Sequence, residues 1–167
     1  MTIREICDIL RNELYDNGYE YGFYLDGTKY RPDMKNGFDH RYDRLARTVY
    51  RVQLPLVTMR EKIGTCIDAM LVMRLLLDNC GIDSRLWLLY NKEKNRPHTV
   101  LTFRTENKTV YLELTPQSSK PWYGKERIYR CDDEFMMEYR DMGYDVYDIT
   151  DSVVPDEPPH FLFPQCK

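Results

Sequence analysis

Residues 64–70 read GTCIDAM, and they place a cysteine where a helix begins. Thr65 is a good N-cap residue, apolar residues follow Cys66 at helical spacing, and Gly81 marks an end, so we predict a helix over residues 66–79. A thiol at a helix N-terminus lies near free backbone N–H groups, which favour the nucleophilic thiolate. Free cysteine is also among the most buried residue types, so position alone leaves a packing role open.

After Gly81 the hydrophobic period changes from that of a helix to the alternation of strands. Residues 84–90, 98–104 and 109–114 alternate in this way, polar turns separate them, and Pro116 ends the third run. Such short turns connect antiparallel strands, because a parallel pair needs a long crossover. We therefore expect an α+β fold in which the Cys66 helix packs on an antiparallel β-sheet.

The rest of the chain predicts helices and loops around this centre. At 167 residues we expect one domain, with a core at 64–116, a helical N-terminal part at 1–63 and a C-terminal helix, strand and extended tail at 117–167. Pro55 is expected to end the second helix or to lie beyond its end. The other expected elements are helices at 2–16, 39–52 and 132–142, a loop or short hairpin at 19–37, an edge strand at 144–150 and an extended tail at 155–167.

Composition excludes several classes of function. The 24 basic and 27 acidic residues are interspersed and give a net charge of −3, which argues against nucleic acid as a partner. No apolar run approaches the ~20 residues that a membrane span needs, and the first residues do not resemble a secretory signal. The five cysteines include no CxxC pair, so we expect free thiols, no metal or other cofactor, and a cytoplasmic location. Fourteen tyrosines, many beside charged residues, hint at a protein-binding surface.

A catalytic cysteine needs a base in contact, and the base needs a polar group to orient it. Of the three histidines, His98 opens the second predicted strand, and Glu113 lies on the third strand opposite its aliphatic face. If Glu106 and Asn107 form the turn, Thr105 pairs with Lys108, and Glu113 becomes the diagonal neighbour of His98 on the same face. A diagonal backbone separation of ~7–8 Å can be bridged by these two side chains.

The run from 64 to 116, GTCIDAMLVMRLLLDNCGIDSRLWLLY…HTVLTF…VYLELTP, resembles the core of the transglutaminase-like cysteine-enzyme superfamily, with its papain-like Cys-His-acid triad. The resemblance implies that Cys66 is the nucleophile, His98 the base and Glu113 the orienting acid, with Glu where the family usually has Asp. It also implies a cysteine hydrolase or acyltransferase that acts on amide bonds of a protein or peptide substrate, as a protease, deamidase or cross-linking enzyme.

The sequence leaves several alternatives open for the roles of these residues and for the function. Gln53 is our candidate for the side chain that binds the oxyanion, although it could equally cap the preceding helix or face solvent. The chain could be an inactive binding module that keeps the fold, or a zinc protein that uses the three triad residues. Asp68 is expected to stabilise the start of the Cys66 helix, and Cys7 and Cys80 are expected to pack in the core.

Overall fold

A computed structural model describes residues 1–33, 35, 39–116 and 121–162 of the chain. Its helices are α1 (Ile3–Leu14), α2 (His40–Val49), α3 (Pro55–Glu61), α4 (Cys66–Asn79), α5 (Asp132–Asp141) and a 3₁₀ turn, η1 (His160–Leu162). Its strands are β1 (Glu20–Tyr21), β2 (Phe23–Leu25), β3 (Thr28–Tyr30), β4 (Ile63–Gly64), β5 (Ser84–Asn91), β6 (Arg96–Thr105), β7 (Lys108–Leu112), β8 (Glu126–Tyr129) and β9 (Asp145–Asp148).

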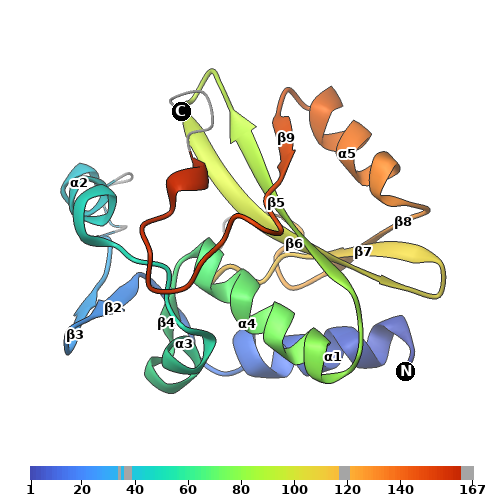
Figure 1. Cartoon of the computed structure of the whole chain (residues 1–167), viewed down its shortest axis with the longest axis horizontal. Helices are drawn as coiled ribbons and strands as arrows, with labels where there is room; N and C mark the ends of the chain where they lie inside the picture. The colour runs from blue at the N-terminus through green and yellow to red at the C-terminus, as the bar shows by residue number, and fades with distance from the viewer. Residues whose placement is uncertain (34, 36–38, 117–120, 163–167) are drawn as a thin grey trace.

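The main sheet of the described chain has five strands in the order β8-β7-β6-β5-β9, and every neighbouring pair is antiparallel (Figure 1). This arrangement confirms the α+β fold class and the predicted edge strand, β9. The register of β6 and β7 is also as predicted, because Thr105 pairs with Lys108. Glu106 and Asn107 have φ of 53° and 57°, as a two-residue hairpin turn with two left-handed residues requires.

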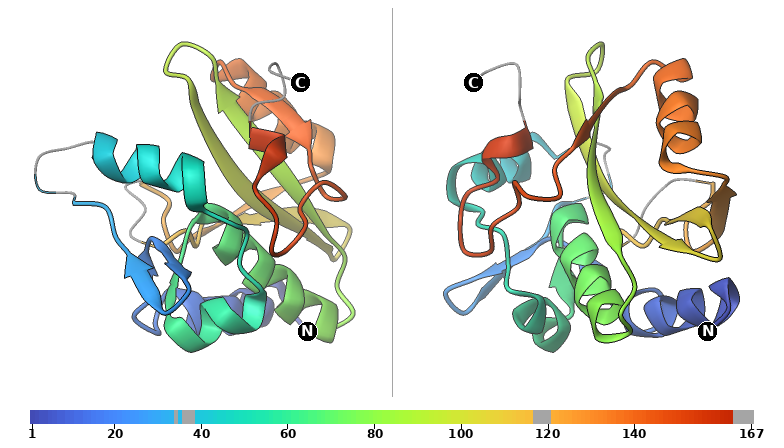
Figure 2. Two further views of the ribbon diagram at one scale, coloured as in Figure 1. Left: turned by 60° about the vertical axis from the view of Figure 1, so that its left-hand side comes forward. Right: turned by 45° about the vertical axis from the view of Figure 1, so that its right-hand side comes forward.

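The sheet is buried on both faces. Helix α4 packs on one face and α5 on the other, and the right-hand view of Figure 2 shows them on opposite sides of the β5–β6 hairpin. Successive side chains of a strand point to opposite faces of the sheet, so Leu88 and Phe103 face α4, and Trp87 and Val100 face α5. Helix α4 is apolar on most of its sides because it also contacts α1 and α3.

The segment between α2 and α4 differs from the sequence prediction. Helix α2 ends at Val49, none of its residues is fully buried, and Val52 is buried in the extended segment that follows. Pro55 lies beyond the end of α2, as one of the two expected positions had it, but it also starts a helix that was not predicted, α3, at a position where its missing N–H costs nothing. Strand β8 was also not predicted, whereas the short hairpin of β2 and β3 was.

The C-terminal part of the chain folds back on the extended segment after α2. Val52 exchanges backbone hydrogen bonds with this part, donating to Glu157 at 2.9 Å and accepting from Asp156 at 2.7 Å. Phe161 is buried, so the predicted surface tail is anchored in the core. Residues 163–167, with Cys166, lie outside the described residues. None of the helices in the described part is long and apolar enough to cross a membrane.

Candidate active site

Cys66 is the first residue of α4, and the sequence around it fixes the start of that helix. Thr65 is the N-cap, and its hydroxyl accepts from the backbone N–H groups of Ile67 at 3.2 Å and Asp68 at 3.4 Å. The Asp68 carboxylate accepts in return from the backbone N–H of Thr65 at 2.9 Å. This reciprocal capping box confirms the role expected of Asp68 and leaves the backbone N–H of Cys66 at the free end of the helix.

Asp68 also ties the start of α4 to the neighbouring chain. Its carboxylate accepts from the Tyr50 hydroxyl at 2.7 Å and from the backbone N–H of Gln53 at 2.9 Å. Burial raises the pKa of Asp68 to about 6, although these hydrogen bonds act in the opposite direction. Asp68 is therefore part of the framework that holds Cys66 in place.

His98 and Glu113 meet as the sheet register predicts. His98 Nε2 lies 2.7 Å from Glu113 Oε2, and this distance confirms the predicted contact. His98 lies in β6 and keeps 22% of its side chain exposed, whereas Glu113, just beyond the end of β7, is 2% exposed. Because Nε2 is bound to Glu113, the ring nitrogen left for the sulfur of Cys66 is Nδ1.

Cys66, His98 and Glu113 shift one another's pKa values in the direction that favours their charged forms. Burial would raise the pKa of the Cys66 thiol, but the hydrogen bond and positive charge of His98, with hydrogen bonds from Thr99, lower it. Burial would lower the pKa of His98, yet the charge of Glu113 and the contact with Cys66 raise it to about 10. Burial would raise the pKa of Glu113, and the charge of His98 lowers it to about 2. At neutral pH these shifts keep His98 as an imidazolium and Glu113 as a carboxylate, and they favour ionisation of Cys66.

The side-chain amide of Gln53 is engaged by other groups. Its amide nitrogen donates to Thr58 Oγ1 at 2.8 Å and to the carbonyl of Ile63 at 3.0 Å, and its oxygen accepts from the backbone N–H of Tyr24 at 2.7 Å. Both amide hydrogens are engaged, and the side chain is buried. We therefore correct the prediction for Gln53 to a framework residue that joins β2, α3 and β4.

Two tyrosines beside Cys66 were missed by the sequence analysis. Tyr21 in β1 pairs with Gly64 in β4, two residues before the nucleophile. Burial raises the pKa of Tyr21 well above its usual value, and the charge of Cys66 acts in the same direction, as it does on Tyr42. The Tyr21 and Tyr42 rings lie 6.3 Å apart. Because β1 and β4 have two residues each, only the three-dimensional pairing reveals this placement.

Among the residues that the structure describes, the thiols other than Cys66 do not form a second site. Cys7 is buried as predicted, but Cys80 is exposed, which corrects the prediction that it packs in the core. Cys131 is also exposed. The described residues contain no group of three or more His, Cys, Asp or Glu side chains arranged to hold a metal ion, so the zinc alternative has no geometric support.

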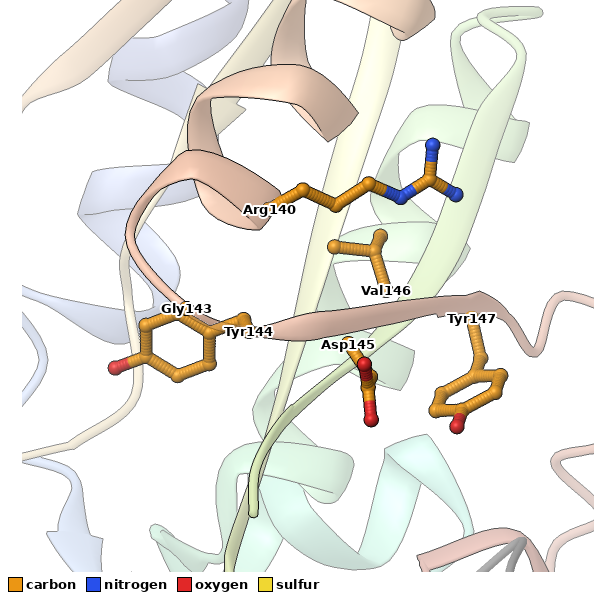
Figure 3. A pocket seen from close by; sticks show the side chains of 6 residues that line it. All are labelled: Arg140, Gly143, Tyr144, Asp145, Val146 and Tyr147. Carbon is orange, nitrogen blue, oxygen red and sulfur yellow. The ribbon is translucent and has the colours of Figure 1, made fainter. Parts of the chain in front are cut away.

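A hollow in the surface lies away from these residues, along strand β9 and the end of α5. It has a volume of about 440 Å³ and is lined by Arg140 and residues 143–147. Figure 3 shows the side chains of Arg140 and Val146 on one side of β9 and those of Asp145 and Tyr147 on the other. The hollow is therefore an open surface around a charged edge strand, and it contains none of the predicted site residues.

Comparisons with known proteins add little to this geometry. No protein-family model matches the chain, and no curated protein matches its sequence. Among solved structures, that of Legionella pneumophila LapG is similar with a TM-score of 0.44 and 15% sequence identity, over 84% of this chain and 76% of that chain. A likeness of this size assigns no activity, so membership of the transglutaminase-like superfamily stays a prediction, and any function depends on the side chains of the site.

Proposed function

We propose that the protein is a cysteine hydrolase or acyltransferase that acts on amide bonds, with Cys66 as nucleophile, His98 as base and Glu113 as orienting acid. The observation that carries the proposal is the 2.7 Å contact of a buried carboxylate with His98, beside a thiol at the start of a helix. A nucleophile, a base and a group that orients the base are the parts that such chemistry needs. The resemblance of residues 64–116 to the transglutaminase-like superfamily agrees with this arrangement.

The geometry supports the following steps. The Cys66 thiolate attacks the carbonyl carbon, and the carbonyl oxygen becomes an oxyanion. When the C–N bond breaks, the His98 imidazolium gives its proton to the leaving amine, and a thioester remains on Cys66. Water, or a second amine, gives a proton to His98 and releases the acyl group. Glu113 holds the ring and stabilises its charge without taking the proton.

The oxyanion needs two donors near Cys66. The backbone N–H of Cys66 is one, because the first N–H groups of a helix have no partner inside the helix. For the second donor we propose the hydroxyl of Tyr21 in place of Gln53. Its raised pKa keeps the phenol protonated, and the β1–β4 pairing places Tyr21 next to the segment that leads into Cys66.

Alkylation with iodoacetamide at pH 6 tests the proposal without a known substrate. An ordinary thiol has a pKa of about 8.5 and is almost fully protonated at this pH. We expect Cys66 to react at least tenfold faster than the exposed Cys80 and Cys131, as measured by peptide mass spectrometry, and His98→Ala to remove the advantage. Equal rates at the three cysteines in the wild type would contradict the proposal.

The alternative of an inactive protein-binding module has less support. It rested on a tyrosine-rich surface, but many of the tyrosines are buried: Tyr19, Tyr50, Tyr90, Tyr111, Tyr129 and Tyr139. A protein or peptide therefore remains our proposed partner as substrate rather than as a bound ligand.

A further inference from the structure

Glu113 is held by more groups than the triad requires. Its Oε2 accepts from the Tyr111 hydroxyl at 2.6 Å as well as contacting His98, and its Oε1 accepts from the backbone N–H of Thr115 at 3.1 Å. A glutamate has one more rotatable bond than an aspartate, so fixing its carboxylate costs more conformational entropy. These additional hydrogen bonds compensate for the longer side chain.

Tyr111 is placed for this role by the strand itself. Tyr111 lies in β7, packs in the aromatic cluster covered by α5, and is two residues before Glu113, so its hydroxyl reaches the Glu113 carboxylate. Tyr111 is 1% exposed, and its ring stacks on Phe135 with a centroid distance of 5.8 Å. Burial and then the charge of Glu113 raise the pKa of Tyr111 well above its usual value. The hydroxyl therefore keeps its proton and remains a donor.

Trp122 sets the direction of that hydroxyl. The indole Nε1 donates to the Tyr111 oxygen at 3.4 Å, and because an indole can only donate, the Tyr111 hydrogen is left for an acceptor. Tyr139 of α5 also faces this hydroxyl, but the Glu113 carboxylate is charged and is the stronger acceptor. The guanidinium of Arg127 lies 5.0 Å from the centre of the Trp122 ring. The backbone also fixes this segment, since the N–H of Gly124 donates to the carbonyl of Glu113 at 2.9 Å.

We propose that Tyr111, oriented by Trp122, is a positioning residue of the catalytic site that fixes the Glu113 carboxylate against His98 and stabilises its negative charge. This inference rests on the proposed function. A hydrogen bond donated to an anion favours the unprotonated form. Without the hydroxyl the Glu113 carboxylate is held less firmly against His98, so the imidazolium is less well placed beside Cys66, and the thiolate should take up a proton at a higher pH.

The test is the pH dependence of Cys66 alkylation in the wild type and in two tyrosine variants. We expect Tyr111→Phe to move the acidic midpoint of the rate upward by about one pH unit, the size expected for one hydrogen bond to a charged group. The control is Tyr129→Phe. Tyr129 is buried in the same aromatic core on the neighbouring strand β8, but its hydroxyl interacts with Glu138 rather than with Glu113. We expect its midpoint to equal that of the wild type.

The outcomes separate this inference from the proposed function. A midpoint in Tyr111→Phe equal to that of the wild type would overturn the inference, as would equal shifts in both tyrosine variants. A wild-type Cys66 that reacts no faster than Cys80 would instead overturn the proposed function. If circular dichroism shows that Tyr111→Phe is unfolded, Trp122→Phe replaces it. That variant should shift the midpoint in the same direction by a smaller amount, and no shift would overturn the inference.

Discussion

At the scale of single residues, His98 connects two groups that burial alone would keep neutral. Burial acts to raise the pKa of both Cys66 and Glu113, and the positive charge of His98 reverses the effect at both. The reactivity proposed for Cys66 thus depends on the ion pair of His98 with Glu113, and Glu113 is nearly inaccessible to water. This dependence makes Glu113 the most informative residue to change.

In Glu113→Gln the side chain keeps its shape but loses the charge that stabilises the His98 imidazolium. An acid-to-amide change in a comparable triad costs about 10⁴ in kcat, and we expect a loss of similar size here because hydrogen bonds from Tyr111 and Thr115 hold the longer Glu113 side chain in place. Alkylation of Cys66 near pH 7 should slow as well, because less of the thiol is ionised. Glu93→Gln, which changes an exposed carboxylate, is the control. Equal labelling of Glu113→Gln and the wild type would show that Glu113 does not act on the site.

Tyr21→Phe separates stabilisation of the oxyanion from activation of the thiol. Acylation by p-nitrophenyl acetate passes through an oxyanion, whereas alkylation by iodoacetamide does not. We expect acylation of Cys66 to slow by about 10²-fold, in the range seen when one oxyanion donor is removed, with alkylation unchanged. The release of p-nitrophenol measures the first rate, and Tyr24→Phe on the adjacent strand β2 is the control. A parallel loss of both rates would assign Tyr21 a role in the framework only.

At the scale of elements, the start of α4 is held by Thr65 and Asp68 together with Tyr50, whose hydroxyl lies 3.0 Å from Thr65 Oγ1. We expect Thr65→Ala to lower the free energy of unfolding by about 1–2 kcal/mol, because it removes both the N-cap and this contact. Thr65→Ser retains the hydroxyl and should recover most of the loss. Urea unfolding measures both variants, and an unchanged stability of Thr65→Ala would mean that the cap contributes nothing.

Helix α4 and strands β5 to β7 were predictable because their signals are local. The N-cap, the change of hydrophobic period and the two-residue turn lie within the sequence of each element, and the turn fixes the register that brings His98 to Glu113. Helix α3 was missed because Pro55 ends one helix pattern as readily as it begins another. Gln53, Tyr21 and Trp122 depend on contacts between distant segments, which no local pattern encodes. The contact of Tyr111 with Glu113 could have been predicted, because Tyr111 lies only two residues before Glu113 in the sequence.

At the scale of the whole molecule, the pair of His98 and Glu113 makes stability depend on pH in two windows. Glu113 has a pKa lowered from 4.5 to about 2, so its contribution is present above pH 4.5 and is lost as the pH falls toward 2. His98 has a pKa raised from 6.5 to about 10, so its contribution is present below pH 6.5 and is lost as the pH rises toward 10. The pair therefore stabilises the fold most between these windows.

We expect the difference in free energy of unfolding between the wild type and Glu113→Gln to be largest between pH 5 and 6. It should shrink as the pH falls below 4.5, because the Glu113 carboxyl of the unfolded wild-type chain then takes up a proton, whereas in the folded chain its pKa is lowered to about 2. Urea unfolding at a series of pH values measures the difference. A difference that stays constant from pH 6 to pH 2.5 would show that Glu113 contributes no charge-dependent stability.

The position of β9 at the edge of the sheet has a consequence for the order in which the molecule is assembled. Its partner, β5, carries the apolar run Leu86–Tyr90 and leaves one edge unpaired until residues 145–148 have been synthesised. By then the segments with Cys66, His98 and Glu113 are already complete, so the nascent chain holds its proposed catalytic groups while it still exposes an apolar strand edge that can pair with another chain. A variant that ends at Gly143 should therefore associate with itself in size-exclusion chromatography, whereas the full-length protein at the same concentration should not.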